Sequence, residues 1–210
     1  MPAGSADPSV TDERSLGSVA TVPRTTRDDV IAAAGKLFAE RGFHGTSMRD
    51  LGEELGLLGS SLYSHVSGKD ELLVEVISRG ASLFEAAADA ALSDDADPAT
   101  LLRRLVAGHV DVLVDHEGEA RTFLDEARFL EPGERSKAVG MRDAYEARWR
   151  AVIADGVRSG AFRADVDPKL ASILTLSTIN AMVRWYDPTG PLSRRQIVDA
   201  IAGFALDGLR

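Results

Sequence analysis

The stretch from Thr46 to Leu72 constrains the fold of this chain more than any other part of the sequence. It predicts two short helices on either side of Gly56, followed by the start of a longer helix at Lys69. Apolar residues recur at helical spacing in each part, and a glycine tolerates the left-handed backbone of a tight turn. Two helices joined in this way form the helix-turn-helix arrangement that reads the major groove of DNA.

A motif inside this stretch carries a resemblance to a known family. The second short helix contains Leu62-Tyr63-Ser64-His65-Val66, and the next helix opens with Lys69-Asp70-Glu71-Leu72. This resembles the TetR family of bacterial repressors, in which Leu-Tyr-x-His-aromatic is followed by Lys-acid-x-Leu. The chain departs at Val66, where the family usually has Phe. That change trims an apolar side chain and leaves the polar side chains of the motif in place.

Composition limits the classes of protein to consider. The chain has 210 residues, of which 44% are hydrophobic, and it has no cysteine, which excludes disulfides and thiolate metal sites. It contains no run of about 18 apolar residues, and its first residues lack the apolar centre of a secretory signal. The sequence therefore predicts a cytoplasmic protein that does not associate with membranes.

The net charge of −9 does not by itself indicate a nucleic-acid-binding protein. Even between Arg24 and Glu71, Asp and Glu outnumber Lys and Arg. The prediction of DNA binding therefore depends on the motif and on cations placed locally. An interaction protein that has lost DNA binding remains an alternative. Replacing Tyr63 and Lys69 with Ala would separate the two, since a DNA binder loses affinity broadly across DNA sequences.

The rest of the chain also follows helical periodicity, and no strand pattern is evident. We expect an all-α chain of nine helices, which matches the TetR architecture, with three helices in an N-terminal head. The third helix is expected at about 60–66, the sixth around 123–130, and the eighth to end at Tyr186, before Pro188. The predicted domains are a disordered arm (1–23), a helix-turn-helix DNA-binding domain (24–70) and a ligand-binding and dimerisation domain (71–210).

The head is expected to present its third helix to the major groove. Glycine and serine at the start of that helix would face base edges, and the Tyr, His and Lys of the motif resemble the phosphate contacts of the family. The amide and hydroxyl of a threonine before the second helix can also donate to phosphate, and two arginines on an N-terminal arm could reach a minor groove. The predicted DNA-binding residues are Arg24, Arg27, Thr46, Gly59, Ser60, Ser61, Tyr63, His65 and Lys69.

Each of these residues also has a plain structural interpretation. Tyr63 could be a core ring with its hydroxyl outside, and His65 an ordinary surface histidine. Ser60 and Ser61 could only cap their helix, and the two arginines could be solvated.

The helices after the head carry more large apolar side chains on their inward faces than a thin bundle needs. A cavity with apolar walls and a few placed polar groups is typical of small-molecule sites. The alternative is plain core packing, and for His109 a hydrogen-bonded core histidine. The predicted ligand-binding residues are Phe84, His109, Phe123, Arg128, Met141, Tyr145, Trp149, Leu176, Asn180 and Arg184.

A second resemblance suggests the class of ligand. Three segments, 125–128, 156–163 and 184–192, are similar to TetR-type regulators of steroid and fatty-acid breakdown. That resemblance implies an acyl-coenzyme A thioester as inducer, with its acyl part in the cavity and its phosphates on cationic side chains. Leu176 and Asn180 stand where a ring-bearing ester would require an arginine and a large aromatic, which argues against a steroid. Two alternatives remain, a repressor of an efflux or detoxification gene with a lipophilic inducer, and a simple helix end at 184–192.

The last two helices predict a homodimer interface. Small residues would allow close approach, and a dimer would place two heads about 34–36 Å apart on a palindromic operator. A bound ligand would tilt the helix that begins at Lys69 about a hinge at Gly68, and so change the spacing of the heads. The residues expected at the interface are Ile173, Leu174, Ala181, Ile197, Ala200, Ile201, Gly203, Phe204 and Ala205.

An enzyme is the competing class, and the sequence offers little for it. It contains no phosphate-binding glycine loop, no Gly-x-Ser-x-Gly and no His-Glu-x-x-His. The four histidines show no metal-ligand spacing, and the paired carboxylates are in exposed contexts. We therefore predict no catalytic residue, no metal and no cofactor.

Overall fold

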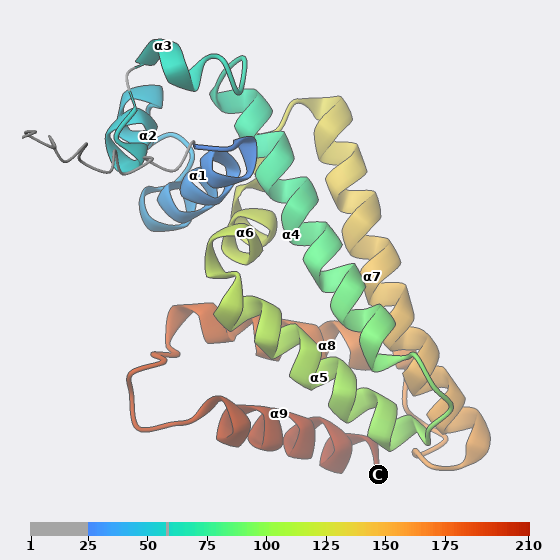
Figure 1. Ribbon diagram of the computed structural model, residues 1–210. Coiled ribbons are helices and arrows are strands. Elements are labelled where there is room, and N and C mark those ends of the chain that lie inside the picture. The colour runs from blue at the N-terminus through green and yellow to red at the C-terminus, as the bar shows by residue number, and fades with distance from the viewer. Residues whose placement is uncertain (1–24, 58) are drawn as a thin grey trace, which may run out of the picture.

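The computed structural model describes residues 25–57 and 59–210, and every regular element in these ranges is helical, as predicted. The arm predicted for residues 1–23 lies outside them. Figure 1 shows α1–α3 gathered at one end of the long α4, with α7 beside α4 and with α5, α8 and α9 toward the other end. The elements are α1 (Arg27–Arg41), α2 (Met48–Leu55), α3 (Gly59–Leu62), α4 (Lys69–Ala91), α5 (Pro98–Asp115), α6 (Glu117–Arg121), a π-helical segment (Thr122–Glu126), a 3-10 turn (Ala127–Phe129), α7 (Pro132–Ser159), α8 (Pro168–Asn180), a 3-10 turn (Ala181–Arg184) and α9 (Arg194–Leu209).

Side-chain caps fix where most of these helices begin. Thr26, Ser47 and Ser193 each form a capping box with the residue three positions later, at the starts of α1, α2 and α9. Asp97 and Asp167 cap α5 and α8, each ahead of a proline at the first helical position. Gly56, with a φ of 63°, ends α2 in the left-handed conformation, which confirms the expected turn.

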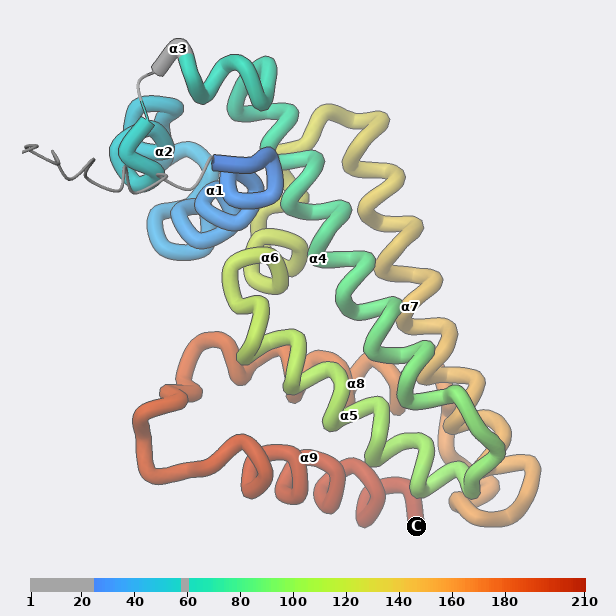
Figure 2. Tube along the Cα trace, in the orientation of Figure 1, coloured from blue at the N-terminus to red at the C-terminus, as the bar shows by residue number. Residues whose placement is uncertain are grey.

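Two glycines let the head pack directly on the rest of the molecule through α6. A Cβ on Gly118 of α6 would lie 2.8 Å from the backbone carbonyl carbon of Gly35 in α1, and a Cβ on Gly80 of α4 would lie 2.6 Å from the Glu119 carbonyl oxygen. No side chain fits at such distances. Figure 2 shows the trace of α6 beside both α1 and α4. The head, defined here as residues 27–66, is therefore seated closely on the body, residues 69–210.

The expected count of nine helices is not reproduced element by element. The third helix is a single turn, because beyond Leu62 the chain makes turn-type bonds, including Ser64 Oγ to the Ser61 carbonyl at 2.7 Å. The sixth begins at Glu117, earlier than expected, and then widens into π geometry. There the Thr122 hydroxyl donates back to the Gly118 carbonyl at 2.7 Å, and a side chain of α7 binds two backbone carbonyls.

The eighth helix also ends differently. It tightens into a 3-10 turn at Ala181–Arg184 and stops short of Tyr186. Within the described ranges, no helix has both the length and the hydrophobicity needed to cross a membrane.

Candidate functional site

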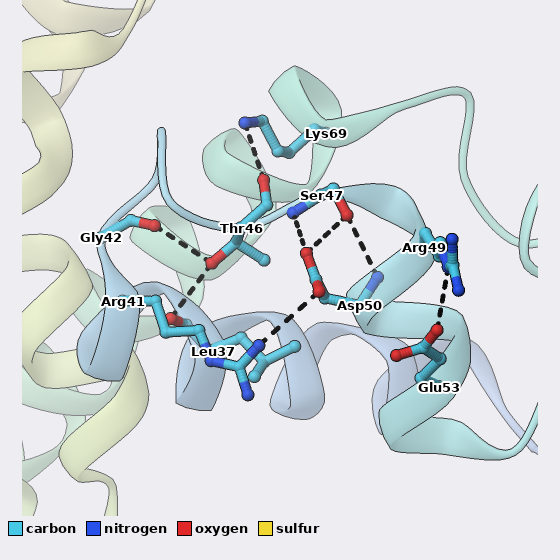
Figure 3. Close-up of polar contacts among 9 residues, drawn as sticks. All are labelled: Leu37, Arg41, Gly42, Thr46, Ser47, Arg49, Asp50, Glu53 and Lys69. Atoms are coloured by element: carbon cyan, nitrogen blue, oxygen red, sulfur yellow. Dashed lines mark hydrogen bonds and ion pairs between the residues drawn. The ribbon is translucent and has the colours of Figure 1, made fainter.

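The loop between α1 and α2 is fixed by a network of polar contacts (Figure 3). Thr46 is 2% exposed, and its hydroxyl donates to the carbonyls of Leu37 and Gly42 at 3.2 and 3.0 Å. Its amide donates to the Phe43 carbonyl at 3.3 Å. Both donors that were predicted to contact phosphate are therefore used inside the head, because the loop must satisfy its own buried carbonyls. Ser47, not Thr46, caps α2.

Lys69 joins this loop to the start of α4. Its Nζ donates to the carbonyls of Phe43 and Thr46 at 2.8 and 2.9 Å, and lies 4.3 Å from the centre of the Phe43 ring. An ammonium group has three donors, and the residues that the structure describes supply acceptors for two of them. The position predicted as a phosphate contact is thus first a structural tie between the head and α4.

Arg27 is not on an N-terminal arm as predicted. It is the first residue of α1, and its guanidinium bonds to Glu71 at 2.7 Å and Glu75 at 3.2 Å, and donates to the His65 carbonyl at 3.3 Å. Hydrogen bonds from Ser67, with that from Arg27, lower the pKa of Glu71 to about 2. The spacing of Glu71 and Glu75, one turn apart on α4, is the sequence signal that could have identified this acceptor.

The remaining head residues differ in how far they are exposed. Tyr63 is 56% exposed, which excludes the alternative of a core ring, and Ser61 is also exposed. The half-buried His65 lies beside them in the chain. Arg24, and the surroundings of Gly59 and Ser60, lie outside what the structure describes.

The body contains a cavity of about 510 Å³ between α4, α5, α7 and α8. Six predicted ligand residues line it, and they come from parts of the chain up to about a hundred residues apart. The six are Phe84, His109, Phe123, Tyr145, Leu176 and Asn180.

The other four predicted ligand residues do not line this cavity. Trp149 is fully buried core, and Met141 packs against the core. Arg128 is exposed, 3.8 Å from Glu126, and Arg184 lies at smaller hollows beside the π-helical segment. Helical periodicity predicted inward or helix-terminal positions for all four. Whether an inward residue belongs to the core or lines the cavity depends on how α7 packs against α4, which periodicity does not show.

Charged side chains that the sequence reasoning missed also line the cavity. Arg142 and Arg150 of α7 and Lys169 of α8 are cationic, and Asp143 and Glu146 are acidic. The spacing of 142, 146 and 150 on one face of a single helix is the signal that could have revealed them. Among the described residues, no group of three or more His, Asp or Glu side chains is placed to hold a metal ion.

One of these cations also touches the junction with the head. Arg142 donates to the carbonyls of Phe123 and Leu124, the latter at 2.7 Å, within the π-helical segment. At the end of that segment, the buried Glu126 carboxylate accepts the Phe43 amide at 2.7 Å. Hydrogen bonds thus lead from a cavity wall to the loop that Lys69 holds.

The outer face of α8 and α9 is unusually apolar. Leu174 and Phe204 are 58% and 73% exposed, and Leu170, one turn before Leu174, is exposed as well. An apolar groove of about 360 Å³ runs between the two helices, lined by Leu174, Ile201 and Phe204 among others. A contiguous patch of this kind marks an interaction surface in soluble proteins.

Comparison with known proteins agrees with this architecture. Residues 30–76 match the family described as bacterial regulatory proteins, tetR family, and residues 95–209 match the tetracyclin repressor-like C-terminal domain. The HTH-type transcriptional repressor KstR2 of Rhodococcus jostii is 30% identical over 186 residues, 87% of this chain and 90% of that protein.

Two solved structures share the fold. The TetR family regulator PfmR from Thermus thermophilus has a TM-score of 0.78 at 35% identity, covering 86% of this chain and 98% of that one. AibR, in complex with isovaleryl coenzyme A and operator DNA, has a TM-score of 0.78 at 24% identity, covering 85% and 96%. At that identity the second likeness concerns the fold alone.

Proposed function

The chain belongs to the TetR family of bacterial regulatory proteins, and on that basis we propose that it is a transcriptional repressor controlled by an acyl-coenzyme A thioester. In this proposal a dimer binds a palindromic operator in the cytoplasm. Filling of the cavity in the body then releases the dimer from DNA.

The observation that carries the ligand class is the mixed lining of the cavity. Phe84, Phe123 and Leu176 give an apolar wall for an acyl chain, while Arg142 and Arg150 are cations that can meet phosphate oxygens. A purely apolar inducer would have no use for such cations. The complex of AibR with isovaleryl coenzyme A gives an example of this ligand class on the same fold.

DNA binding is assigned to the head. Exposure of Ser61 and Tyr63, at and just beyond α3, supports contacts of these side chains with a duplex, and we assign the third donor of Lys69 to a phosphate. Gly59, Ser60, His65 and Arg24 remain proposed contacts. Dimerisation is assigned to the apolar face of α8 and α9, because two such faces would cover Leu174 and Phe204.

A coupling route follows from the contacts at the junction. A ligand phosphate that draws Arg142 away would free the carbonyls of the π-helical segment. Glu126 would then shift against Phe43, and with it the loop that Lys69 ties to α4. Such a shift changes the spacing between two heads only if the ligand binds the two states differently.

One specific observation favours a second candidate function. Asp143 and Glu146 also line the cavity, and carboxylates beside aromatic rings suit a lipophilic cation. The alternative is therefore a repressor of an efflux or detoxification gene.

A selection from random duplex DNA, followed by fluorescence anisotropy, tests both proposals. We expect an enriched palindrome with half-sites about one helical turn apart. Micromolar octanoyl-coenzyme A should release the dimer from it, and tetraphenylphosphonium should not. Release by the cation alone would replace the acyl-thioester proposal with the alternative, and no enriched sequence would contradict DNA binding itself.

A further inference from the structure

A buried polar chain crosses the wall of the cavity and joins three helices. His109 of α5 lies between Tyr145 of α7 and Asn180 of α8. Its Nδ1 is 2.9 Å from the Tyr145 hydroxyl, and its Nε2 is 2.8 Å from Asn180 Oδ1. The Phe84 ring of α4 packs on the imidazole, with the ring centres 4.5 Å apart. The ring is therefore held from all sides by the helices that form the cavity.

The chemistry of these groups fixes the direction of each hydrogen bond. Asn180 Oδ1 carries no hydrogen, so Nε2 of His109 donates to it. Burial disfavours the imidazolium and lowers the pKa of His109 to about 4, so the ring holds only this one N–H near neutral pH. Nδ1 is then an acceptor, and the Tyr145 hydroxyl uses its hydrogen to donate to it.

What remains at the cavity wall is the amide nitrogen of Asn180. The half-buried Asn180 lines the cavity, and its two N–H groups have no acceptor in the ranges that the structure describes. Its cavity neighbours include the apolar Phe123, Leu124 and Leu176 and the polar Arg142 and Ser177. The amide nitrogen is therefore available to a ligand that supplies an acceptor, and a hydrogen bond made there inside the cavity would add to affinity.

We propose that the Asn180 amide donates to an uncharged carbonyl oxygen of the ligand, and that His109 and Tyr145 act as positioning residues that fix the amide orientation. This inference rests on the proposed function, and it names the part of the ligand that the site reads. An acyl-coenzyme A thioester has one carbonyl between its acyl chain and its sulfur. Asn180 would bind that oxygen while the acyl chain meets the apolar wall.

Isothermal titration calorimetry on the full chain tests this with a matched pair of ligands. Octanoyl-coenzyme A is a thioester, and S-octyl-coenzyme A is the thioether in which a methylene replaces the carbonyl. We expect the wild-type protein to bind the thioester at least about fivefold more tightly, as for one hydrogen bond to an otherwise unpaired donor. Asn180→Asp keeps an oxygen for His109 and replaces the donor with an acceptor. Its preference should fall to about one or invert.

Ser177, one turn earlier on α8, offers a competing hydroxyl donor on the same cavity. If Ser177→Ala loses the preference and Asn180→Asp keeps it, the assignment to Asn180 is wrong. Equal binding of thioester and thioether by the wild-type protein overturns the inference and leaves the acyl-thioester proposal standing. Binding of neither compound overturns both. The wild-type comparison does not depend on the folding of any variant.

Discussion

The head and the cavity use polar side chains in opposite ways. In the head, Thr46 and Arg27, together with Lys69 at the start of α4, satisfy neighbouring carbonyls and carboxylates, so the loop and both helix starts are fixed before any DNA arrives. In the cavity, Asn180 and Arg150 face open volume between helices. The head is thus fixed by its own contacts, whereas the cavity keeps a group, the Asn180 amide nitrogen, for which the described residues provide no acceptor. In the proposed function, release from DNA depends on how the second region changes the seating of the first.

The largest expected effect separates core from cavity within the body. Trp149→Ala should lower the free energy of unfolding by about 3–5 kcal/mol, because it empties a fully buried site. Urea denaturation measures this. The control is Trp185→Ala, at a position 54% exposed, which should change stability by less than about 0.5 kcal/mol. A stable Trp149→Ala protein that has lost only ligand affinity would return Trp149 to the binding site.

The seating of the head on the body can be loosened at one glycine. Gly118→Ala should cost about 1–3 kcal/mol, because its Cβ would lie 2.8 Å from the α1 backbone. Gly140→Ala, in the exposed part of α7 with no atom within 4 Å, should instead stabilise the protein by up to about 1 kcal/mol. Thermal melting compares the two. Equal effects would mean that α1 and α6 can separate without loss, which contradicts a close junction.

The buried histidine makes the stability of the body depend on pH. The pKa of His109 is lowered from 6.5 to about 4 by burial, so between these values the unfolded chain binds a proton that the folded chain does not. The contribution of neutral His109 to the free energy of unfolding is therefore fully present above about pH 6.5. It falls toward pH 4 by up to about 1.4 kcal/mol per pH unit. Denaturation of wild type and His109→Gln between these values measures it. Parallel curves for the two proteins would show that His109 is not the titrating group.

The sequence predicted local helical structure better than contacts between distant segments. The helix class, the turn at Gly56 and the start of α4 at Lys69 follow from local spacing, and they were predicted correctly. Contacts between segments were not, because Glu71 and Glu75 meet Arg27 only after α1 folds against α4. Periodicity marks an inward face but does not show whether that face meets another helix or an empty volume.

This limit explains the mixed outcome for the predicted ligand residues. Tyr145 and Trp149 are one turn apart on the same face of α7, yet only Tyr145 lines the cavity. Arg142 was missed because charge on a long helix usually faces solvent, whereas here its guanidinium binds the carbonyls of a π-helical segment. The π-helical segment is held by that contact and by the hydrogen bond of the Thr122 hydroxyl. Short-range sequence patterns therefore do not predict it.

The smallest predicted effect tests whether contacting DNA and stabilising the fold are carried by different residues, Tyr63 and Lys69. Tyr63→Phe removes an exposed hydroxyl, so operator affinity should fall by about 0.5–1.5 kcal/mol with no change in stability. A neutral hydroxyl displaces no counterion, so the salt dependence of binding should stay the same.

Lys69→Met should differ from Tyr63→Phe both in stability and in the salt dependence of DNA binding. It should lower the unfolding free energy, because the carbonyls of Phe43 and Thr46 lose their donor, and it should reduce the salt slope by about 0.9 if the third donor contacts a phosphate. Anisotropy titrations over a range of salt concentrations, paired with urea denaturation, separate the two variants. A Lys69→Met protein of unchanged stability would mean that Lys69 contributes only to DNA binding. The polar groups around the head would then depend on an external partner, as those of the cavity do.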